Sequence, residues 1–331
     1  MVNNILIFRT DRIGDLLYTC PALLTIKNNL SNAQITLIAS KKNFAYAKSL
    51  QIFDKVDLFP QKNLLSKIKF IYHLSKLKFD YIFIFDGKNR SIIASIFIRS
   101  RYKVAIITEK KLNRIWNFFK IKFINNKKEN LINLFQESLN HCQINKKITN
   151  FDFLKNKNDN RFNSRIKIKN YLHIHLDEKW FTNLYIKTYT EINPSYDDMV
   201  DFINQLSKNY DILITTGLVD FQLIDNLKNK FFIRETDNIY YKKNLDKFIY
   251  FVYKPTFDDL ISILNNAQIL ISCHGAITHA ANSFDIQIID IIDENKKSWY
   301  SRYTYYLRNY KPIYRGKFSK IQKNLISQLS H

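Results

Sequence analysis

Short apolar runs alternate along this chain with segments whose apolar residues recur at helical spacing. The first example spans residues 5–24, and its run from Ile5 to Phe8 has the length and β-branched content of a buried parallel strand. A polar turn at 9–12 follows, and apolar residues then recur from Leu16 to Leu24 with the period of a helix. This order of strand, tight turn and helix is typical of the first unit of a doubly wound α/β domain.

The same alternation predicts two α/β domains with a parallel sheet in each. In the first half, strands are expected at 35–40, 56–59, 79–85 and 102–107, with a basic amphipathic helix at 62–78. In the second half, strands are expected at 171–176, 211–216, 247–253, 268–272 and 286–292, and helices near 196–208, 219–229, 255–267 and around His279. We therefore expect domains at 1–160 and 161–315 with a polar linker at 144–169, and a C-terminal helix within 316–331 that packs back on the first domain.

Composition narrows the classes of protein. At 331 residues the chain is long enough for two ordinary cores, and its apolar runs stay well below the about 18–20 residues that span a bilayer. Three widely spaced cysteines fit neither a disulfide framework nor a zinc site. No signal-like segment opens the chain, so we expect a cytoplasmic protein.

The net charge of +22 would suit a nucleic-acid partner. The chain is, however, rich in Lys, Asn and Ile and holds only five glycines, a pattern that nucleotide bias in a genome can produce without selection for charge. No recognised nucleic-acid motif is present, and we expect no such partner.

Two segments, 62–78 and 110–128, mix cations with apolar and aromatic residues. Each could lie against the cytoplasmic face of an inner membrane or bind an anionic acceptor. Each could also be an ordinary amphipathic helix with a solvated basic face. We favour a binding role more for the second segment, where Trp116, Phe118 and Phe119 lie among lysines.

Glycine placement directs attention to the ends of the strands. Four of the five glycines, Gly14, Gly87, Gly217 and Gly275, each follow a predicted strand. This placement predicts backbone that needs a positive φ or a close approach to a ligand, although turn geometry alone would explain any one of them. Ligands of α/β sheets bind beyond the carboxyl ends of the strands, so candidate chemistry is expected there.

Asp15 directly follows the first of these glycines and supports two interpretations that its spacing weighs about equally. It could take a proton from an acceptor hydroxyl as a general base. It could also stabilise the N-terminus of the helix that it opens. Asp11 has the same ambiguity, or pairs only with Arg9 or Arg12. We assign the function to Asp15.

The second half offers polar residues at two further strand ends. The turn 273–276 enters a helix, where free N–H groups would form an anion site suited to a diphosphate. Within this turn, Cys273 is more simply a small buried residue, and His279 one turn later is more simply a core histidine. Lys179 could neutralise a phosphate leaving group, although a solvated lysine is the simpler interpretation.

His173 and His175 alternate on one strand and therefore face the same side of the sheet. A metal site would need a third ligand at suitable spacing, and the sequence offers none that is convincing. We expect no metal.

Four blocks of the sequence resemble glycosyltransferase family 9, the bacterial lipopolysaccharide heptosyltransferases. They are ILIFRTDRIGDLLYTCPAL, FDYIFIFDGKNRS, YLHIHLDEKW and DDLISILNNAQILISCHGAITHAAN, in the family's order. The resemblance implies two Rossmann-like domains that face each other across a cleft, the GT-B arrangement, and metal-independent inverting transfer of a sugar. It implies no cofactor, because a nucleotide diphosphate sugar such as ADP-heptose is the co-substrate.

Carried over by position, the resemblance makes Asp15 the catalytic base. It assigns donor binding to the second domain, at Lys179, Thr216, Gly217, Asp220, Cys273, His274, Gly275, Ala276 and His279. It assigns acceptor binding to the first domain, at Arg12, Gly14, Arg90 and Ser91. The acceptor would be an anionic glycan or glycolipid of the cell envelope, such as a lipopolysaccharide core.

The sequence departs from the family's pattern in the donor half. Cys273 and His274 stand where the family shows Asp followed by Thr or Ser, and one extra residue separates Gly275 from His279. These departures motivate an alternative, a nucleotide-sugar-binding protein of the same fold without transfer activity. A basic α/β protein that acts on nucleic acid is the third hypothesis.

Overall fold

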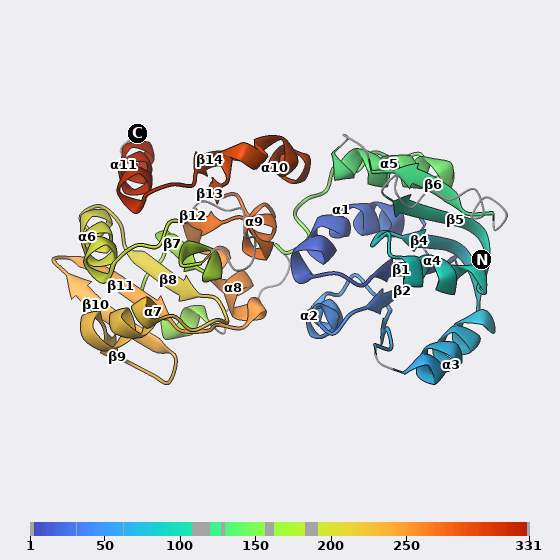
Figure 1. Ribbon diagram of the computed structural model, residues 1–331, viewed down its shortest axis with the longest axis horizontal. Coiled ribbons are helices and arrows are strands. Elements are labelled where there is room, and N and C mark those ends of the chain that lie inside the picture. The colour runs from blue at the N-terminus through green and yellow to red at the C-terminus, as the bar shows by residue number, and fades with distance from the viewer. Residues whose placement is uncertain are drawn as a thin grey trace. The chain divides into compact units, whose positions relative to one another are not determined.

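The computed structural model describes residues 3–30, 32–61, 63–107, 120–126, 130–155, 162–182 and 191–329 (Figure 1). The chain divides into two compact units, Met1–Phe153 and Leu154–His331. The division falls inside the polar segment 144–169, slightly before the expected boundary at residue 160. Each unit is an α/β structure with its own sheet.

The first unit contains a parallel sheet whose strands follow the order β3-β2-β1-β4-β5-β6. These strands are β1 (Asn3–Arg9), β2 (Ala33–Ala39), β3 (Lys55–Leu58), β4 (Lys78–Ile84), β5 (Arg99–Ile107) and β6 (Lys122–Asn125). Strand β1 lies at the centre, and its residues from Ile5 to Arg9 are buried, as the continuous apolar run predicts.

Helices cover both faces of this sheet. The helices are α1 (Ile13–Asn29), α2 (Phe44–Ser49), α3 (Leu64–Ser75), α4 (Asn89–Ile96) and α5 (Leu131–His141). Tyr18 of α1 and Phe135 of α5 are in ring contact at 5.8 Å. Leu74 of α3 and Ile92 of α4 belong to the core cluster that includes Phe8 of β1.

The second unit contains a sheet of order β14-β13-β12-β7-β8-β11-β10-β9, in which only β10 runs antiparallel to its neighbours β11 and β9. Its strands are β7 (Tyr171–Leu176), β8 (Ile212–Thr216), β9 (Ile233–Arg234), β10 (Ile239–Asn244), β11 (Lys247–Val252), β12 (Ala267–Cys273), β13 (Gln287–Ile292) and β14 (Tyr310–Tyr314). The helices are α6 (Tyr196–Leu206), α7 (Gln222–Asn226), α8 (Phe257–Leu264), α9 (Ala276–Ala281), α10 (Lys297–Thr304) and α11 (Phe318–Leu329). Short 3₁₀ turns lie at Asn163–Arg165, Glu178–Trp180 and Glu294–Lys296, and a π-helical turn at Leu227–Phe231.

The structure adds elements that the sequence pattern did not reveal. The short strands β6, β9, β10 and β14 and the helix α10 were not expected. Strand β6 has four residues, too few for a period to be read, and β14 leaves Lys311 and Pro312 exposed.

The C-terminal helix corrects one expectation. We expected residues 316–331 to pack on the first domain, but α11 buries Phe318, Ile321 and Leu325 in the core of the second unit. Phe318 meets Phe202 of α6 edge-on at 5.6 Å. The apolar face of α11 is thus already occupied, so this helix belongs to the second unit. Across the described ranges, no helix combines the length and the apolar character that crossing a bilayer requires.

Candidate active site

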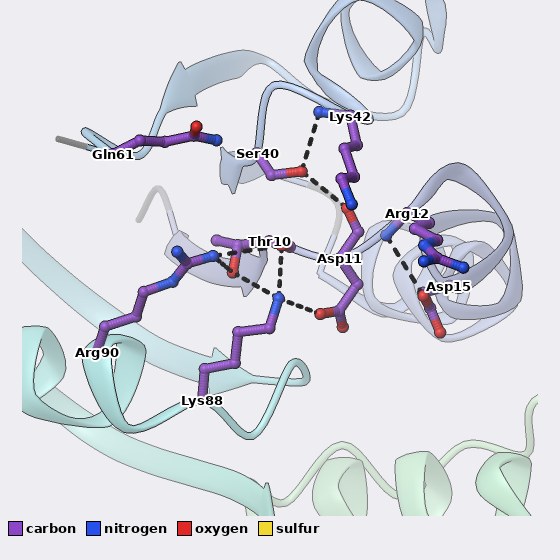
Figure 2. A pocket seen from close by; sticks show the side chains of 9 residues that line it. All are labelled: Thr10, Asp11, Arg12, Asp15, Ser40, Lys42, Gln61, Lys88 and Arg90. Atoms are coloured by element: carbon purple, nitrogen blue, oxygen red, sulfur yellow. Dashed lines mark hydrogen bonds and ion pairs between the residues drawn. The ribbon is translucent and has the colours of Figure 1, made fainter. Parts of the chain in front are cut away.

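A pocket of about 550 Å³ opens in the first unit, at the carboxyl end of β1. Four cations and two carboxylates dominate its lining, and Figure 2 shows the Asp15 and Arg90 side chains at opposite sides of it. The lining residues are Thr10, Asp11, Arg12, Asp15, Ser40, Lys42, Gln61, Lys88 and Arg90. The pocket therefore suits an anionic ligand and also presents two carboxylates.

Asp15 lies in the first turn of α1, two residues beyond the start of the helix. Its carboxylate accepts a hydrogen bond from the backbone N–H of Arg12, at 3.3 Å. This contact caps the helix N-terminus, as one of the two interpretations predicts. The side chain is nonetheless 40% exposed and lines the pocket, so capping leaves it accessible to a ligand.

A buried arginine lies beneath the two carboxylates. The Arg9 guanidinium is 3.3 Å from Asp11 Oδ2 and 3.6 Å from Asp15 Oδ1, and its Nε donates to the Asp15 carbonyl at 2.9 Å. Burial raises the pKa of Asp11, while Arg9 and the Lys88 ammonium, which pairs with Asp11, act to lower it. Asp11 is thus held between two cations.

The cationic wall of the pocket is organised around Thr10. Arg90 donates to the Thr10 hydroxyl at 2.7 Å, and Lys88 donates to the Thr10 carbonyl at 2.6 Å. The Thr10 hydroxyl in turn donates to Asp86 Oδ2 at 2.5 Å. The loops after β1 and β4 are therefore joined by side-chain hydrogen bonds, which hold Lys88 and Arg90 toward the pocket (Figure 2).

Gly87 is the glycine that this loop requires. Its φ is +54°, and a Cβ there would lie 2.4 Å from the carbonyl oxygen of Ile106. Gly14 lies instead within the first turn of α1, and among the described glycines only Gly87 has a positive φ. The expectation of a positive φ is therefore confirmed for Gly87 and not met by Gly14, for which a close approach to a ligand stays a prediction.

The structure brings together some of the expected acceptor residues. Arg12 and Arg90 line the pocket together with Asp15, the expected base, whereas Gly14 is not among the lining residues. Ser91 does not line it, because its side chain is buried and its hydroxyl donates to Asp86 at 2.7 Å. Lys42 and Lys88 were missed, although Lys88 follows directly after the Asp86-Gly87 strand end that had been recognised.

In the second unit, Lys179 is not a solvated lysine. It lies in the turn after β7, is buried, and its ammonium forms an ion pair with Asp177. Burial acts to lower the pKa of Lys179, but the Asp177 carboxylate outweighs it, so the pKa is raised. The ammonium therefore stays protonated and already has a counter-ion, which the sequence analysis did not foresee.

Two of the expected glycines pack against this turn. A Cβ on Gly275 would lie 3.3 Å from Lys179 Nζ, and a Cβ on Gly217 would lie 3.2 Å from Asp177 Cα. The carboxyl ends of β7, β8 and β12 thus meet at the Asp177–Lys179 pair. Gly217 and Gly275 thus closely approach residues of the protein's own chain, Asp177 and Lys179.

The turn that leads into α9 differs from an open anion cradle. The Gly275 N–H donates to the Thr278 hydroxyl at 3.2 Å, and Ala276 begins a helix of six residues. The His274 Nδ1 atom lies 2.7 Å from Oδ2 of Asp290, a carboxylate that is fully buried on β13. The contact with the Asp290 carboxylate therefore orients the His274 imidazole.

Two other residues of this loop have core environments. Burial raises the pKa of the Cys273 thiol to about 12, so this cysteine stays a thiol and contacts Arg315 at 3.4 Å. His279 is buried, and its Nδ1 atom lies 3.0 Å from the Tyr306 hydroxyl. Burial is the main cause that lowers the pKa of His279 well below the usual value, and the neighbouring His274 lowers it further. The simpler interpretations of Cys273 and His279 agree with these environments.

Thr216 and Asp220 lie beside β11. The Thr216 hydroxyl accepts from the Lys254 backbone N–H at 2.8 Å. Asp220 forms an ion pair with the Lys254 ammonium at 2.6 Å and accepts a hydrogen bond from Tyr253. Asp220, Tyr253 and Lys254 thus form an exposed polar cluster. None of the contacts given above joins this cluster to the Asp177–Lys179 pair.

The two histidines of β7 share one hydroxyl. His173 Nε2 and His175 Nδ1 each lie 2.8 Å from the Thr215 hydroxyl of β8. Burial lowers the pKa of both, that of His175 to about 3, so both imidazoles are neutral. In the described ranges, no group of three or more His, Cys, Asp or Glu side chains is arranged to hold a metal ion. Residues 108–119, which include the aromatic part of the basic segment 110–128, lie outside the described residues.

No protein-family profile matches the sequence, and no curated protein sequence does. The fold, however, is similar to those of several solved structures. A glycosyl transferase family 9 protein from Veillonella parvula has 11% identity and a TM-score of 0.67, with 98% of this chain and 89% of that chain covered. The E. coli heptosyltransferase WaaC, solved with ADP, has 13% identity and a TM-score of 0.66, with 98% and 96% covered.

An enzyme of another class shares the fold. The UDP-GlcNAc 2-epimerase from Methanocaldococcus jannaschii has 12% identity and a TM-score of 0.57, with 100% of this chain and 92% of that chain covered. These similarities confirm the predicted fold class, α/β with two Rossmann-like domains of the GT-B type. Because transferases and an epimerase share it, the reaction has to be argued from the site.

Proposed function

We propose that the protein is an inverting, metal-independent glycosyltransferase. It would move a sugar, heptose from ADP-heptose as the first choice, to a hydroxyl of an anionic cell-envelope glycan or glycolipid such as a lipopolysaccharide core. The observation that carries the proposal is an accessible carboxylate, Asp15, in a pocket lined by Arg12, Lys42, Lys88 and Arg90. A base beside cations is what an anionic acceptor with a reactive hydroxyl needs.

The acceptor occupies this pocket in the proposed reaction. The cations bind its carboxylate or phosphate groups, which orients one hydroxyl toward Asp15. Asp15 takes the hydroxyl proton as the oxygen attacks the anomeric carbon from the face opposite the nucleotide. A new C–O bond forms, the bond to the diphosphate breaks, and the configuration at the anomeric carbon inverts.

The donor binds the second unit in this proposal, at the carboxyl ends of β7, β8 and β12. Lys179 and the turn around Gly275 are assigned to the diphosphate, where positive charge stabilises the departing nucleotide. Asp220 and Thr216 are assigned to the nucleoside side. The ion pair with Asp177 implies that a bound diphosphate shares the Lys179 ammonium with that carboxylate.

A nucleotide-sugar binder without transfer activity is the second candidate. It is favoured by the internal pairing of Lys179 with Asp177 and of His274 with Asp290. Both candidates predict nucleotide-sugar binding, and only the first predicts a product.

The test has two stages. Thermal melts with ADP-, GDP-, UDP- and dTDP-linked sugars should show a raised Tm with at least one of them, because a ligand that binds only the folded state stabilises it. The donor so identified is then incubated with lipopolysaccharide core acceptors, and glycosylated product is sought by mass spectrometry. A shift without product on any acceptor would support the binder, and no shift with any nucleotide sugar would overturn both.

A further inference from the structure

Helix α3 exposes an apolar face. Leu64, Leu65, Ile68 and Tyr72 lie at spacings of one, three and four residues, so they occupy one side of the helix. Their exposed fractions are 69%, 65%, 54% and 61%. In Figure 1 the helix lies at the margin of the first unit. Four large apolar side chains on one helix are a patch that a folded protein has reason to cover.

The opposite side of α3 already satisfies the needs of folding. Leu74 is buried in the core, and Phe70 and Ile71 pack against the same cluster. A helix that rests on a sheet needs an apolar stripe of about 100°, with polar residues on its other side. The apolar arc of α3 is roughly twice that width, so the outer face is not explained by packing within the unit.

The charge around this face has one sign. Residues 62–78 contain five lysines and neither Asp nor Glu. Lys69 and Lys76 are exposed, and the Lys76 ammonium lies 4.3 Å from the centroid of the Tyr72 ring. An apolar face bordered by lysines is complementary to a bilayer with anionic headgroups. A neutral surface would offer these lysines no comparable electrostatic attraction.

Contacts connect α3 to the pocket. Gln61, just before the helix, lines the pocket with Asp15. Phe70 of α3 meets Phe59 edge-on at 5.8 Å, and the guanidinium of Arg90 lies 5.1 Å from the centroid of the same Phe59 ring. The inner side of α3 is therefore joined to the cationic wall of the pocket through Phe59.

We propose that the outer face of α3 binds the surface of an anionic lipid bilayer. Leu64, Leu65, Ile68 and Tyr72 enter the boundary between headgroups and acyl chains, and the lysines beside them contact the headgroups. The helix then lies in the plane of the interface. This membrane contact goes beyond the proposed transfer reaction and does not depend on it.

Vesicle binding tests the proposal with the full chain. Co-sedimentation is measured with phosphatidylcholine vesicles alone and with vesicles that also contain phosphatidylglycerol. The wild type is expected to bind the anionic vesicles, and the double variant L65S/I68S to bind them at least tenfold more weakly. Replacing Lys69 and Lys76 by Gln should weaken binding about fivefold for each lysine, the worth of one cation near an anionic surface.

Matched variants in the second unit control for unspecific effects. Leu245 is 77% exposed on a turn, so L245S removes an exposed leucine elsewhere. Lys208→Gln with Lys230→Gln removes the same charge from two exposed lysines. All of these should bind like the wild type, and unchanged melting curves should show that every variant is folded.

Three outcomes would overturn the proposal: no binding of the wild type to anionic vesicles, equal binding by L65S/I68S, or loss of a wild-type dimer in L65S/I68S without any vesicle binding. The last would assign the face to a second copy of the chain. Nucleotide-sugar melts do not involve α3, so a failure here leaves the transfer reaction to its own test.

Discussion

Asp11 and Asp15 share one guanidinium, since the two terminal nitrogens of Arg9 lie 3.3 Å from Asp11 and 3.6 Å from Asp15. The two carboxylates nevertheless differ. Asp11 also pairs with Lys88, and its side chain is 19% exposed, against 40% for Asp15. Of the two, Asp15 is therefore the carboxylate more accessible to a ligand in the pocket.

The first prediction concerns this difference. Asp15→Asn should lower kcat by roughly two to four decades, the usual worth of a positioned base, with donor binding retained. The melting temperature should change little, because the amide oxygen can still accept from the Arg12 N–H. Turnover with the identified donor and acceptor is the measurement. Asp57→Asn, outside the pocket, is the control, and a near wild-type rate for Asp15→Asn would remove this residue from the role.

The second prediction concerns Gly87. Gly87→Ala should destabilise the first unit by more than about 1 kcal/mol, because a side chain disfavours its positive φ and the added Cβ meets the Ile106 carbonyl. Gly316→Ala is the matched control, since nothing lies within 4 Å of a Cβ there. Urea unfolding measures both. Equal stabilities would show that the loop after β4 can adopt another conformation.

The third prediction concerns the Asp177–Lys179 pair. Asp177→Asn leaves the Lys179 ammonium buried without its counter-ion, which should cost about 3–5 kcal/mol of unfolding free energy. Combining Asp177→Asn with Lys179→Met removes both charges and should recover most of that loss. A double variant no more stable than the single one would indicate that the pair contributes little as a pair.

The fourth prediction concerns acid stability. His173, His175 and His279 have folded-state pKa values below 6.5, so the unfolded chain binds more protons than the folded chain below that pH. Their contribution to stability should therefore be lost as the pH falls through 6.5, by about 1.4 kcal/mol per pH unit for each histidine. For His175 the loss continues to about pH 3.

Urea unfolding between pH 7.5 and 5.5 checks this dependence. His175→Gln, which can keep a hydrogen bond to Thr215, should reduce the slope by about one histidine's share. His141→Gln, at an exposed position, is the control for replacing a histidine. An unchanged slope in His175→Gln would mean that this imidazole becomes protonated in the folded state.

Local patterns in the sequence were sufficient for the fold class and for most of its strands and helices. The run from Ile5 to Phe8 and the helical spacing after Leu16 predicted β1 and α1. Asp15 became a candidate because it lies where these two elements join. These features depend on neighbours a few residues away, so a single sequence contains them. The family resemblance, rather than local spacing, assigned Arg12 and Arg90 to the acceptor side with Asp15, and the pocket includes all three.

Only the tertiary structure decided which partner each polar side chain has. Thr10 and Arg90 are eighty residues apart, and His274 and Asp290 are sixteen apart, yet strand order and register bring each pair within hydrogen-bond distance. The periodicity of residues 62–78 likewise predicted a basic amphipathic helix, but only packing against the core decided that Leu74 is buried and Leu65 exposed. Partner choice and burial arise from contacts between segments distant in the chain, and local spacing contains no information about those contacts.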